Sequence, residues 1–300
     1  MSVFDALVKH GLPLVPKPIV GRFAKRYVAG ATLENAVTAI RALNAEGAMA
    51  TVDVLGEEVV EREKAEAAVA EYMRLLERIA KEGIDANVSI KLTLVGLKVD
   101  EGLCAANVDA IAKCAASLGN FVRIDMEDRT TTDATLRIYK ATLANRGNVG
   151  TVLQAYMRRT TSDIRQLLPI RPNLRICKGI YREPRTVAWK DFDSIRANYI
   201  HSVDTLLEAG CYVGIATHDP YLVAAGMRTI DRLGLDRDRY EFQMLLGVDP
   251  ELRTIIIDAG HRLRVYVPYG RDWYPYSTRR LRENPTVARH VVRALLRGGD

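Results

Sequence analysis

The stretch AMATVDVLGEEVVEREKAEAAVAEYMRLLERIAKEGIDANVSIKL, residues 48–92, contains the pattern that decides the fold. Two apolar runs rich in β-branched residues, at 48–55 and 86–92, flank a segment at 61–83 whose apolar residues recur with helical spacing. A strand, a helix and a second strand in this order are typical of parallel strands joined by a helical crossover. The stretch therefore predicts one β-α-β unit.

The same alternation continues along the chain. Further apolar runs occur at 120–126, 150–157, 173–179, 211–217, 241–247 and 264–270. Eight strand-and-helix units in about 250 residues favour a closed (β/α)8 barrel over an open, doubly wound sheet. The expected fold class is therefore α/β, with residues 47–300 forming a TIM-like barrel. No Pro/Gly/Ser linker interrupts the sequence, which predicts a single domain overall.

Residues 1–46 read as an N-terminal helical extension to this barrel. Thr32 is a candidate helix N-cap, and Gly47 is a typical helix stop. An apolar stripe with helical spacing lies between them, at Leu33, Ala36, Val37, Ile40 and Leu43.

The composition indicates a globular protein with a large core and a basic character. Hydrophobic residues make up 48% of the 300 residues, and the formal net charge is +6 with a pI of about 9.1. This charge favours anionic ligands. The sequence shows no zinc-finger spacing, no aromatic RNA-recognition signature and no concentrated basic arm, so we expect no nucleic-acid partner.

Cysteine usage and hydropathy predict a cytoplasmic location. The four cysteines form no CxxC pair, which favours reduced thiols. The N-terminal segment MSVFDALVKH contains Asp5 and lacks the long apolar core of a signal peptide. No apolar stretch approaches the roughly 18 residues needed to cross a bilayer.

Several common catalytic motifs do not occur in the sequence. There is no GxGxxG or Walker phosphate loop, no HExxH zinc motif and no GxSxG nucleophile elbow, and the five histidines are scattered. We therefore expect no metal. Phosphate-bearing cofactors, Schiff-base lysines and sugar phosphates stay open as candidates.

Polar side chains follow almost every apolar run, where a barrel of this kind has its active site. They include Lys91, Asp125, Gln154, Arg175, Lys178, Thr217, His218, Gln243 and Tyr266. Because cations outnumber carboxylates in this set, we expect a ligand with phosphate or carboxylate groups. Taken singly, each residue has a simpler explanation: a lone lysine is usually solvated, Asp125 is placed to cap the next helix, and His218 precedes the turn at Pro220.

The C-terminal segment WYPYSTRRLRENP, residues 273–285, raises a further expectation. In a helix, Tyr276, Arg279, Arg280 and Glu283 fall at i, i+3, i+4 and i+7 and share one face. Two guanidinium groups side by side suit a carboxylate ligand. The alternative is a solvated, charged helix surface.

Eight motifs in order give the chain a resemblance to proline dehydrogenase, the flavin-dependent enzyme of proline catabolism. They are SIKLT, RIDMED, TVLQAYMRRT, RICKGIYREP, IATHDP, EFQMLLGV, RVYVPYG and YSTRRLRENP. The segment LNAEGAMATVDVLGEEV, residues 43–59, resembles the monofunctional bacterial form, and the resemblance runs from about residue 24 to residue 285. It implies a distorted barrel with a C-terminal helix over its mouth and with FAD bound non-covalently. It also implies oxidation of L-proline to 1-pyrroline-5-carboxylate, by hydride transfer to FAD and then electron transfer to a quinone, as the first step of catabolism to glutamate.

The resemblance also implies roles for individual residues. The flavin would contact Met126, Gln154, Lys178, Gly179, Ile180, Thr217 and His218, with Arg175 near its reactive N5 edge. Asp125 would lie in the substrate pocket, and Asp125 and Arg175 would be the catalytic pair. The substrate carboxylate would be held by Lys91, Arg279 and Arg280, and the substrate ring by Tyr181, Leu245, Tyr266 and Tyr276. Glu283 would help to hold the last helix closed.

Two positions depart from this pattern. Arg182 follows Tyr181 where some relatives have tryptophan, and Asp219 follows His218 where many have asparagine. The first change affects the contact expected on the adenine side of the cofactor, and the second affects a turn beside the flavin.

Other functions stay open from the sequence. The nearest is a dehydrogenase of hydroxyproline, which Tyr266 would disfavour by crowding the far carbon of the ring. A Schiff-base lyase or aldolase using Lys91 belongs to a different class, and a non-enzymatic basic binding protein to a third.

The tail TVARHVVRALLRGGD, residues 286–300, has the pattern of a basic amphipathic helix. Val287, Val291 and Leu295 form one stripe, while arginines recur separately at the same spacing. Peripheral contact with the inner face of an anionic membrane is one interpretation, and packing against the barrel is the other. The chain is too short for a fused aldehyde dehydrogenase module, so a separate pyrroline-5-carboxylate dehydrogenase is a further expected partner.

Overall fold

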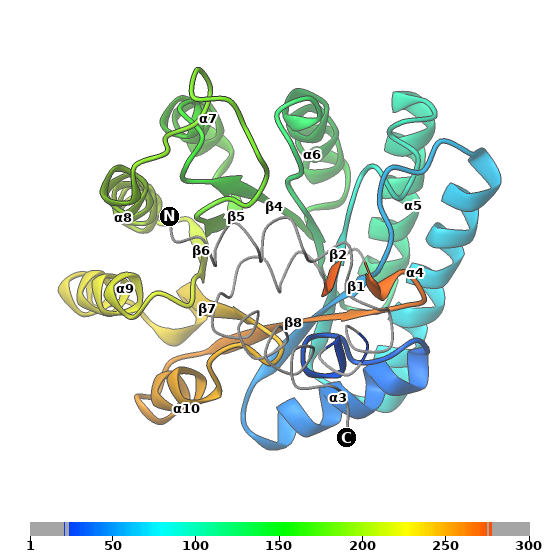
Figure 1. Cartoon of the computed structure of the whole chain (residues 1–300), viewed down its shortest axis with the longest axis horizontal. Helices are drawn as coiled ribbons and strands as arrows, with labels where there is room; N and C mark the ends of the chain where they lie inside the picture. The colour runs from blue at the N-terminus through cyan, green and yellow to red at the C-terminus, as the bar shows by residue number, and fades with distance from the viewer. Residues whose placement is uncertain (1–20, 22–23, 275, 278–300) are drawn as a thin grey trace, which may run out of the picture.

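The computed structural model describes residue 21, residues 24–274 and residues 276–277. Eight parallel strands close into a barrel in the order of the sequence (Figure 1). The strands are β1 (Met49–Val54), β2 (Ala86–Ile90), β3 (Val122–Ile124), β4 (Val149–Gln154), β5 (Asn173–Cys177), β6 (Tyr212–Ala216), β7 (Tyr240–Leu245) and β8 (Leu263–Tyr269). The predicted (β/α)8 barrel is confirmed, and each strand overlaps its predicted run, beginning at most one residue before it.

Helices surround the barrel as an outer ring (Figure 1). They are α3 (Leu33–Ala45), α4 (Arg62–Glu82), α5 (Glu101–Ser117), α6 (Thr132–Arg146), α7 (Thr160–Leu167), α8 (Phe192–Glu208), α9 (Pro220–Leu233) and α10 (Pro250–Asp258). Two 3-10 turns, η2 (Leu168–Ile170) and η3 (Arg237–Arg239), precede β5 and β7. No helix in the described part of the chain is both long and apolar enough to cross a membrane.

Burial explains why these segments form these elements. All six residues of β4 are buried, as is typical of parallel strands covered by helices on one side and by the side chains that fill the barrel on the other. In α4 the predicted stripe faces the core, with Tyr72 and Leu76 fully buried. Thr32 caps α3, and its side chain accepts a hydrogen bond from the Asn35 backbone N–H.

The parallel register brings the ends of neighbouring strands to one rim of the barrel. β1 and β8 close the barrel over six residue pairs, from Met49 opposite Arg264 to Val54 opposite Tyr269. Asp125 follows β3, Gln154 ends β4 and Lys178 follows β5, so their side chains start from the same edge. The division into residues 1–46 and 47–300 stays a prediction.

The two ends of the described chain meet beside β1 and β8. Tyr276 is buried in a small apolar cluster with Tyr27, Val28 and Leu55, and Trp273 packs on its edge. Helix α3 lies next to β1 and β8 (Figure 1). This packing brings the Tyr276 ring to the carboxyl-end rim of the barrel.

Candidate active site

A cavity of about 410 Å3 opens at the carboxyl ends of the strands. This volume falls in the usual range of small-molecule sites, about 300–1,000 Å3. Every predicted site residue that the structure describes lines it: Lys91, Asp125, Met126, Gln154, Arg175, Lys178, Gly179, Ile180, Tyr181, Thr217, His218, Leu245, Tyr266 and Tyr276. Arg279, Arg280 and Glu283 lie outside the described residues.

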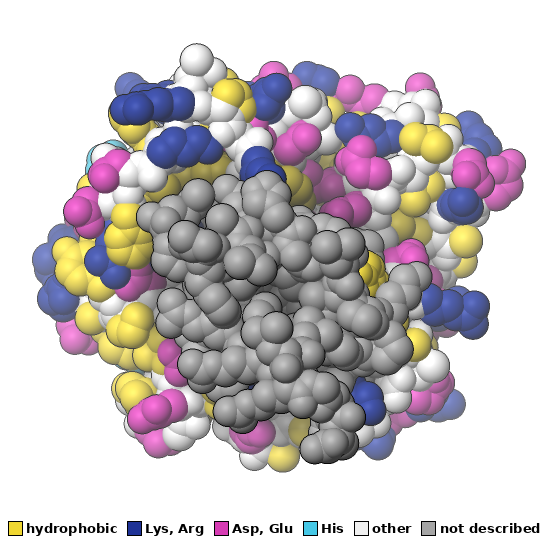
Figure 2. Space-filling model, in the orientation of Figure 1, with side chains coloured by type: hydrophobic (Ala, Val, Ile, Leu, Met, Phe, Trp, Pro, Cys, Tyr) yellow, Lys and Arg dark blue, Asp and Glu magenta, His cyan; other side chains and the backbone are white. Residues whose placement is uncertain are grey.

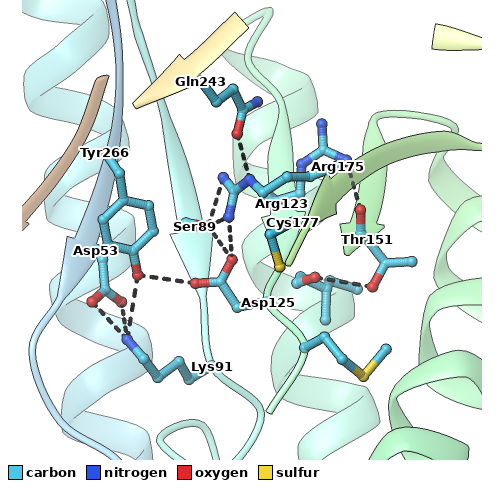
Figure 3. Close-up of polar contacts among 12 residues, drawn as sticks. Asp53, Ser89, Lys91, Arg123, Asp125, Thr151, Arg175, Cys177, Gln243 and Tyr266 are labelled. Carbon is cyan, nitrogen blue, oxygen red and sulfur yellow. Dashed lines mark hydrogen bonds and ion pairs between the residues drawn. The ribbon is translucent and has the colours of Figure 1, made fainter. Parts of the chain in front are cut away.

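A chain of polar contacts crosses the floor of the cavity (Figure 3). The Lys91 ammonium donates to both carboxylate oxygens of Asp53, at 2.7 and 2.6 Å, and lies 3.5 Å from the Tyr266 hydroxyl. Tyr266 in turn donates to Asp125 Oδ2 at 2.9 Å. The other oxygen of Asp125 accepts from Arg175 at 2.7 Å, which completes the chain.

Further groups hold the Asp125–Arg175 pair in place. The Ser89 hydroxyl donates to Asp125 Oδ1 at 2.7 Å, and the Arg175 Nε–H donates to the Gln243 side-chain carbonyl. All of these side chains are buried. Because a buried charge needs a partner with good geometry, the pair is fixed before any ligand arrives.

The predicted cations at the mouth are paired with carboxylates that the sequence reasoning did not assign to them. Each of the three predicted cations has a carboxylate partner: Lys91 pairs with Asp53, Arg175 with Asp125, and Lys178 with Asp219. Asp53, which the sequence reasoning missed, is the only charged residue in the run 48–55 and is fully buried. A charge inside an otherwise apolar strand was the available signal.

The carboxylates decide the protonation of Lys91. Burial alone lowers the pKa of this ammonium, but the nearby Asp53 and Asp125 outweigh burial and leave the pKa above its usual value. A Schiff-base lysine needs the opposite shift, because only the neutral amine is nucleophilic. Lys91 is therefore a fixed cation, which removes the main support for the aldolase alternative.

Tyr266 is held in its neutral form. Burial raises the pKa of the phenol well above its usual value, and the Asp125 and Asp53 charges raise it further. The hydroxyl is therefore a donor to Asp125 at neutral pH, and the ring forms part of the cavity wall.

On the other side of the same mouth, after β5 and β6, two cations surround one carboxylate. Asp219 accepts from Lys178 at 3.0 Å and from both Arg196 donors at 2.8 and 2.7 Å, and it also caps α9. Burial raises the pKa of Asp219, but the hydrogen bonds from Arg196 and Lys178 outweigh it and hold the pKa below the usual value. One net positive charge is left at the N-terminus of α9, an arrangement that suits phosphate.

The hydrogen bond of His218 fixes its donor atom. The Leu245 backbone N–H donates to His218 Nε2 at 2.8 Å, so the proton of the neutral imidazole is on Nδ1. Gln154 uses its amide nitrogen on the Met126 and Glu127 carbonyls, at 3.4 and 3.3 Å. Its amide oxygen is the group that remains for the cavity.

The lining fits the FAD that the resemblance implies. Apolar side chains such as Met126 and Leu245 give the cavity walls for a flat ring system, and Gln154 adds a neutral polar group. The Lys178–Arg196 cluster lies beside them for the pyrophosphate. Within the described residues, no group of three or more His, Cys, Asp or Glu side chains could hold a metal ion.

Comparison with known proteins gives one consistent result. Residues 36–293 match the family described as proline dehydrogenase. The chain is 39% identical over 280 residues to proline dehydrogenase of Deinococcus radiodurans, covering 92% of this chain and 90% of that protein. It is 36% identical over 274 residues to proline dehydrogenase 1 of Bacillus subtilis, covering 91% of each.

Solved structures with the same fold are found among larger proteins. The chain matches proline utilization A (PutA) from Bdellovibrio bacteriovorus, inactivated by N-propargylglycine, with a TM-score of 0.83 and 24% identity. The match covers 88% of this chain but 32% of that protein. PutA from Corynebacterium freiburgense matches with a TM-score of 0.77 over 98% of this chain and 36% of that protein.

Proposed function

The chain belongs to the proline dehydrogenase family and oxidises proline in the first step of proline catabolism, and we propose that it does so with non-covalently bound FAD. The main support is the single cavity that fourteen implied residues line together. FAD would supply the acceptor for the hydride that leaves the carbon next to the proline nitrogen. The product is the cyclic imine 1-pyrroline-5-carboxylate.

The polar network would position the substrate against the cofactor. Asp125 and Arg175 are fixed as a buried pair at 2.7 Å, so Arg175 would present a cation to the reactive edge of the flavin without reorganising. Tyr266 and Leu245 would hold the proline ring, with Tyr181 and Tyr276 as further walls. Such positioning contributes up to about 7–11 kcal/mol in favourable cases.

We propose that the cofactor is held along β4, β5 and β6. Met126 and Gln154 would contact the ring system together with Gly179 and Ile180, while Lys178 would face the phosphates. Thr217 and His218 would complete this side, with the Nδ1–H of His218 as a donor. None of these contacts needs a covalent bond to the flavin.

The substrate carboxylate needs more cations than the described cavity supplies. The Lys91 ammonium already donates to both Asp53 oxygens and, at 3.5 Å, to the Tyr266 hydroxyl, and Asp53 balances its charge. We propose that Arg279 and Arg280 provide the remaining charge, and that Glu283 holds their helix closed. Their positive charge would also lower the pKa of the substrate ammonium and favour the neutral amine that hydride loss requires.

Arg279→Met and Arg280→Met should therefore reduce catalytic efficiency with proline more than flavin content. Loss of a hydrogen bond to a charged group costs about 1.5–3 kcal/mol, which corresponds to roughly a tenfold to hundredfold fall in kcat/KM. Steady-state kinetics and the flavin-to-protein absorbance ratio measure the two effects. Parallel loss of flavin and activity would assign the pair a structural role instead.

Anaerobic addition of L-proline tests the proposed function directly. The flavin absorbance of the purified protein should bleach, and acid or heat denaturation should release all of the yellow colour into the supernatant. Colour that remains on the precipitated protein would refute non-covalent binding. A flavin that stays oxidised after proline is added would refute the proposed mechanism. Faster bleaching by hydroxyproline than by proline would identify hydroxyproline as the preferred substrate.

We further propose a quinone as the electron acceptor and a separate pyrroline-5-carboxylate dehydrogenase as the enzyme that consumes the product. A membrane-dissolved quinone would require the protein to visit the inner face of the membrane. The tail at 286–300 is the segment whose sequence pattern suits that contact.

A further inference from the structure

Gln243 of β7 lines the cavity and joins two buried charge pairs (Figure 3). Its side-chain carbonyl accepts from Arg175 Nε, and its amide nitrogen donates to Glu241 Oε1 at 2.5 Å. Glu241 accepts from Arg264 Nε as well, at 2.9 and 3.0 Å. All four side chains are at least nine-tenths buried.

Glu241 fixes the orientation of the Gln243 amide. Burial by itself raises the pKa of this carboxyl, but Arg264 and its neighbours outweigh burial and lower the pKa to about 2. The carboxylate is therefore ionised at neutral pH and can only accept hydrogen bonds. The NH2 group of Gln243 must face Glu241, and its oxygen must face Arg175.

The Gln243 bond restrains a movement that the other contacts permit. Asp125 and Ser89 contact the terminal nitrogens of Arg175, at 2.7 Å and at 3.4–3.5 Å. A guanidinium held only at this end is free to pivot about the ion pair. The additional bond at Nε fixes the plane of the group and thus the edge that it presents to the cavity.

The backbone of the neighbouring strand leaves room for this amide. A Cβ atom at Gly214 of β6 would lie 2.6 Å from Gln243 Nε2, 3.0 Å from its Cδ and 3.6 Å from the Arg175 Cα. The first distance is too short for a real contact, so any side chain at position 214 displaces the amide. Gly214 has no positive φ, and alanine is therefore compatible with the backbone there.

We propose that Gln243, oriented by the Glu241–Arg264 pair, is a positioning residue that holds the Arg175 guanidinium at the angle needed for hydride transfer. The inference rests on the proposed function, in which Arg175 lies beside the reactive edge of the flavin. Gln243 acts through Arg175, in the way that outer-shell partners orient the groups that contact a reacting centre.

The test compares Gln243→Leu with the unaltered holoenzyme. Leucine keeps most of the volume but removes the acceptor for Arg175 Nε. We expect the limiting rate of anaerobic flavin reduction by proline to fall about tenfold to a hundredfold, the range for losing a hydrogen bond to a charged group. The dissociation constant for proline should change much less. The flavin midpoint potential should become more negative, because a cation held near the ring stabilises the reduced form.

Two further variants separate positioning from stability. Gly214→Ala alters no hydrogen-bonding group, yet it should reproduce the slower reduction and the shifted potential by displacing the amide. Tyr212→Phe is the matched control, because Tyr212 donates to the other oxygen of Glu241 at 2.8 Å, away from the oxygen that accepts from Gln243. Its rate and potential should match those of the unaltered protein.

The outcomes are distinct. If Gln243→Leu and Gly214→Ala lower only the melting temperature, with unchanged rate and potential per bound flavin, the positioning role is overturned. The same holds if Tyr212→Phe shifts the rate and potential as much as they do. If proline fails to reduce the flavin of the unaltered protein, the proposed function fails first.

Discussion

At the scale of single residues, Asp53 determines the protonation state of Lys91. An unpaired lysine in an apolar barrel would lower its pKa and become a nucleophile, whereas the Asp53 carboxylate at 2.6 Å keeps it charged. The pair lies where β1 and β2 are adjacent, with Asp53 opposite Ser89 in the register. The Asp53 carboxylate, which the register places beside Lys91, thus makes Lys91 a cation that can bind an anion and not a nucleophile.

Asp53→Asn should destabilise the protein strongly, because it leaves the buried Lys91 ammonium without its carboxylate. Breaking a buried ion pair at one partner typically costs about 3–5 kcal/mol. The double variant Asp53→Asn/Lys91→Met should regain most of this loss, since no charge is then buried alone. Urea unfolding followed by circular dichroism measures both effects.

The exposed pair of Lys64 and Glu61, at 2.8 Å, supplies the control for that measurement. Lys64→Met should leave the unfolding midpoint nearly unchanged, because solvent screens such a pair. An Asp53→Asn protein as stable as the control variant would show that the Lys91 charge is compensated elsewhere.

The sequence predicts which residues face the cavity better than it predicts their partners. A polar residue in or just after the end of an apolar run identifies Asp125, Lys178 or His218 without knowledge of the neighbouring strand. The contacts of Asp53 with Lys91, and of Gln243 with Arg175, depend on the register between strands. An apolar run does not specify that register, because both faces of a parallel strand are buried.

At the scale of elements, the point where each strand ends determines which residues reach the cavity. The predicted run 120–126 is longer than β3, which ends at Ile124, and the run 173–179 is longer than β5, which ends at Cys177. The residues beyond the strands are Asp125 and Met126 in one case and Lys178 and Gly179 in the other. The regular strand ends at these residues, although single backbone bonds continue from Asp125 N–H to the Ile90 carbonyl and from Tyr156 N–H to the Lys178 carbonyl. Composition alone cannot show where the strand ends.

Gly179 illustrates the geometry that this turn requires. Its φ is +107°, and a Cβ atom there would lie 2.1 Å from the Tyr156 ring. Only glycine accepts both the backbone angle and the close approach. The loop after β5 can therefore pass near Tyr156 and still line the cavity.

Gly179→Ala should destabilise the fold and lower the flavin content of the purified protein. Gly234→Ala, at the end of α9, is the matched control, because Gly234 has a φ of +58° with open space around its Cβ position. The control should cost only the backbone strain of about 1–2 kcal/mol. Unfolding experiments and the flavin-to-protein ratio compare the two, and equal effects would mean that the Tyr156 contact is not limiting.

At the scale of the whole molecule, the closed barrel carries charge of both signs on the face that Figure 2 shows. In Figure 2, basic and acidic side chains are interspersed around the described part of the face that is shown. The net charge of +6 is thus not gathered there into a single basic patch. The tail is the candidate segment for binding an anionic membrane surface, because the arginines of residues 289–297 recur at helical spacing.

Removal of the tail tests that contact. Residues 286–300 lie outside the described part of the structure, and the sequence alone predicts a helix with an apolar stripe and a separate stripe of arginines. If this helix rests on an anionic bilayer, the full chain should float with anionic vesicles, and high salt should release it, because ionic screening weakens such binding. A chain that ends before Thr286 should stay at the bottom of the gradient while still oxidising proline with a water-soluble dye. If the shortened chain unfolds, the stripe packs on the barrel instead. If it floats as well as the full chain, another surface binds the membrane.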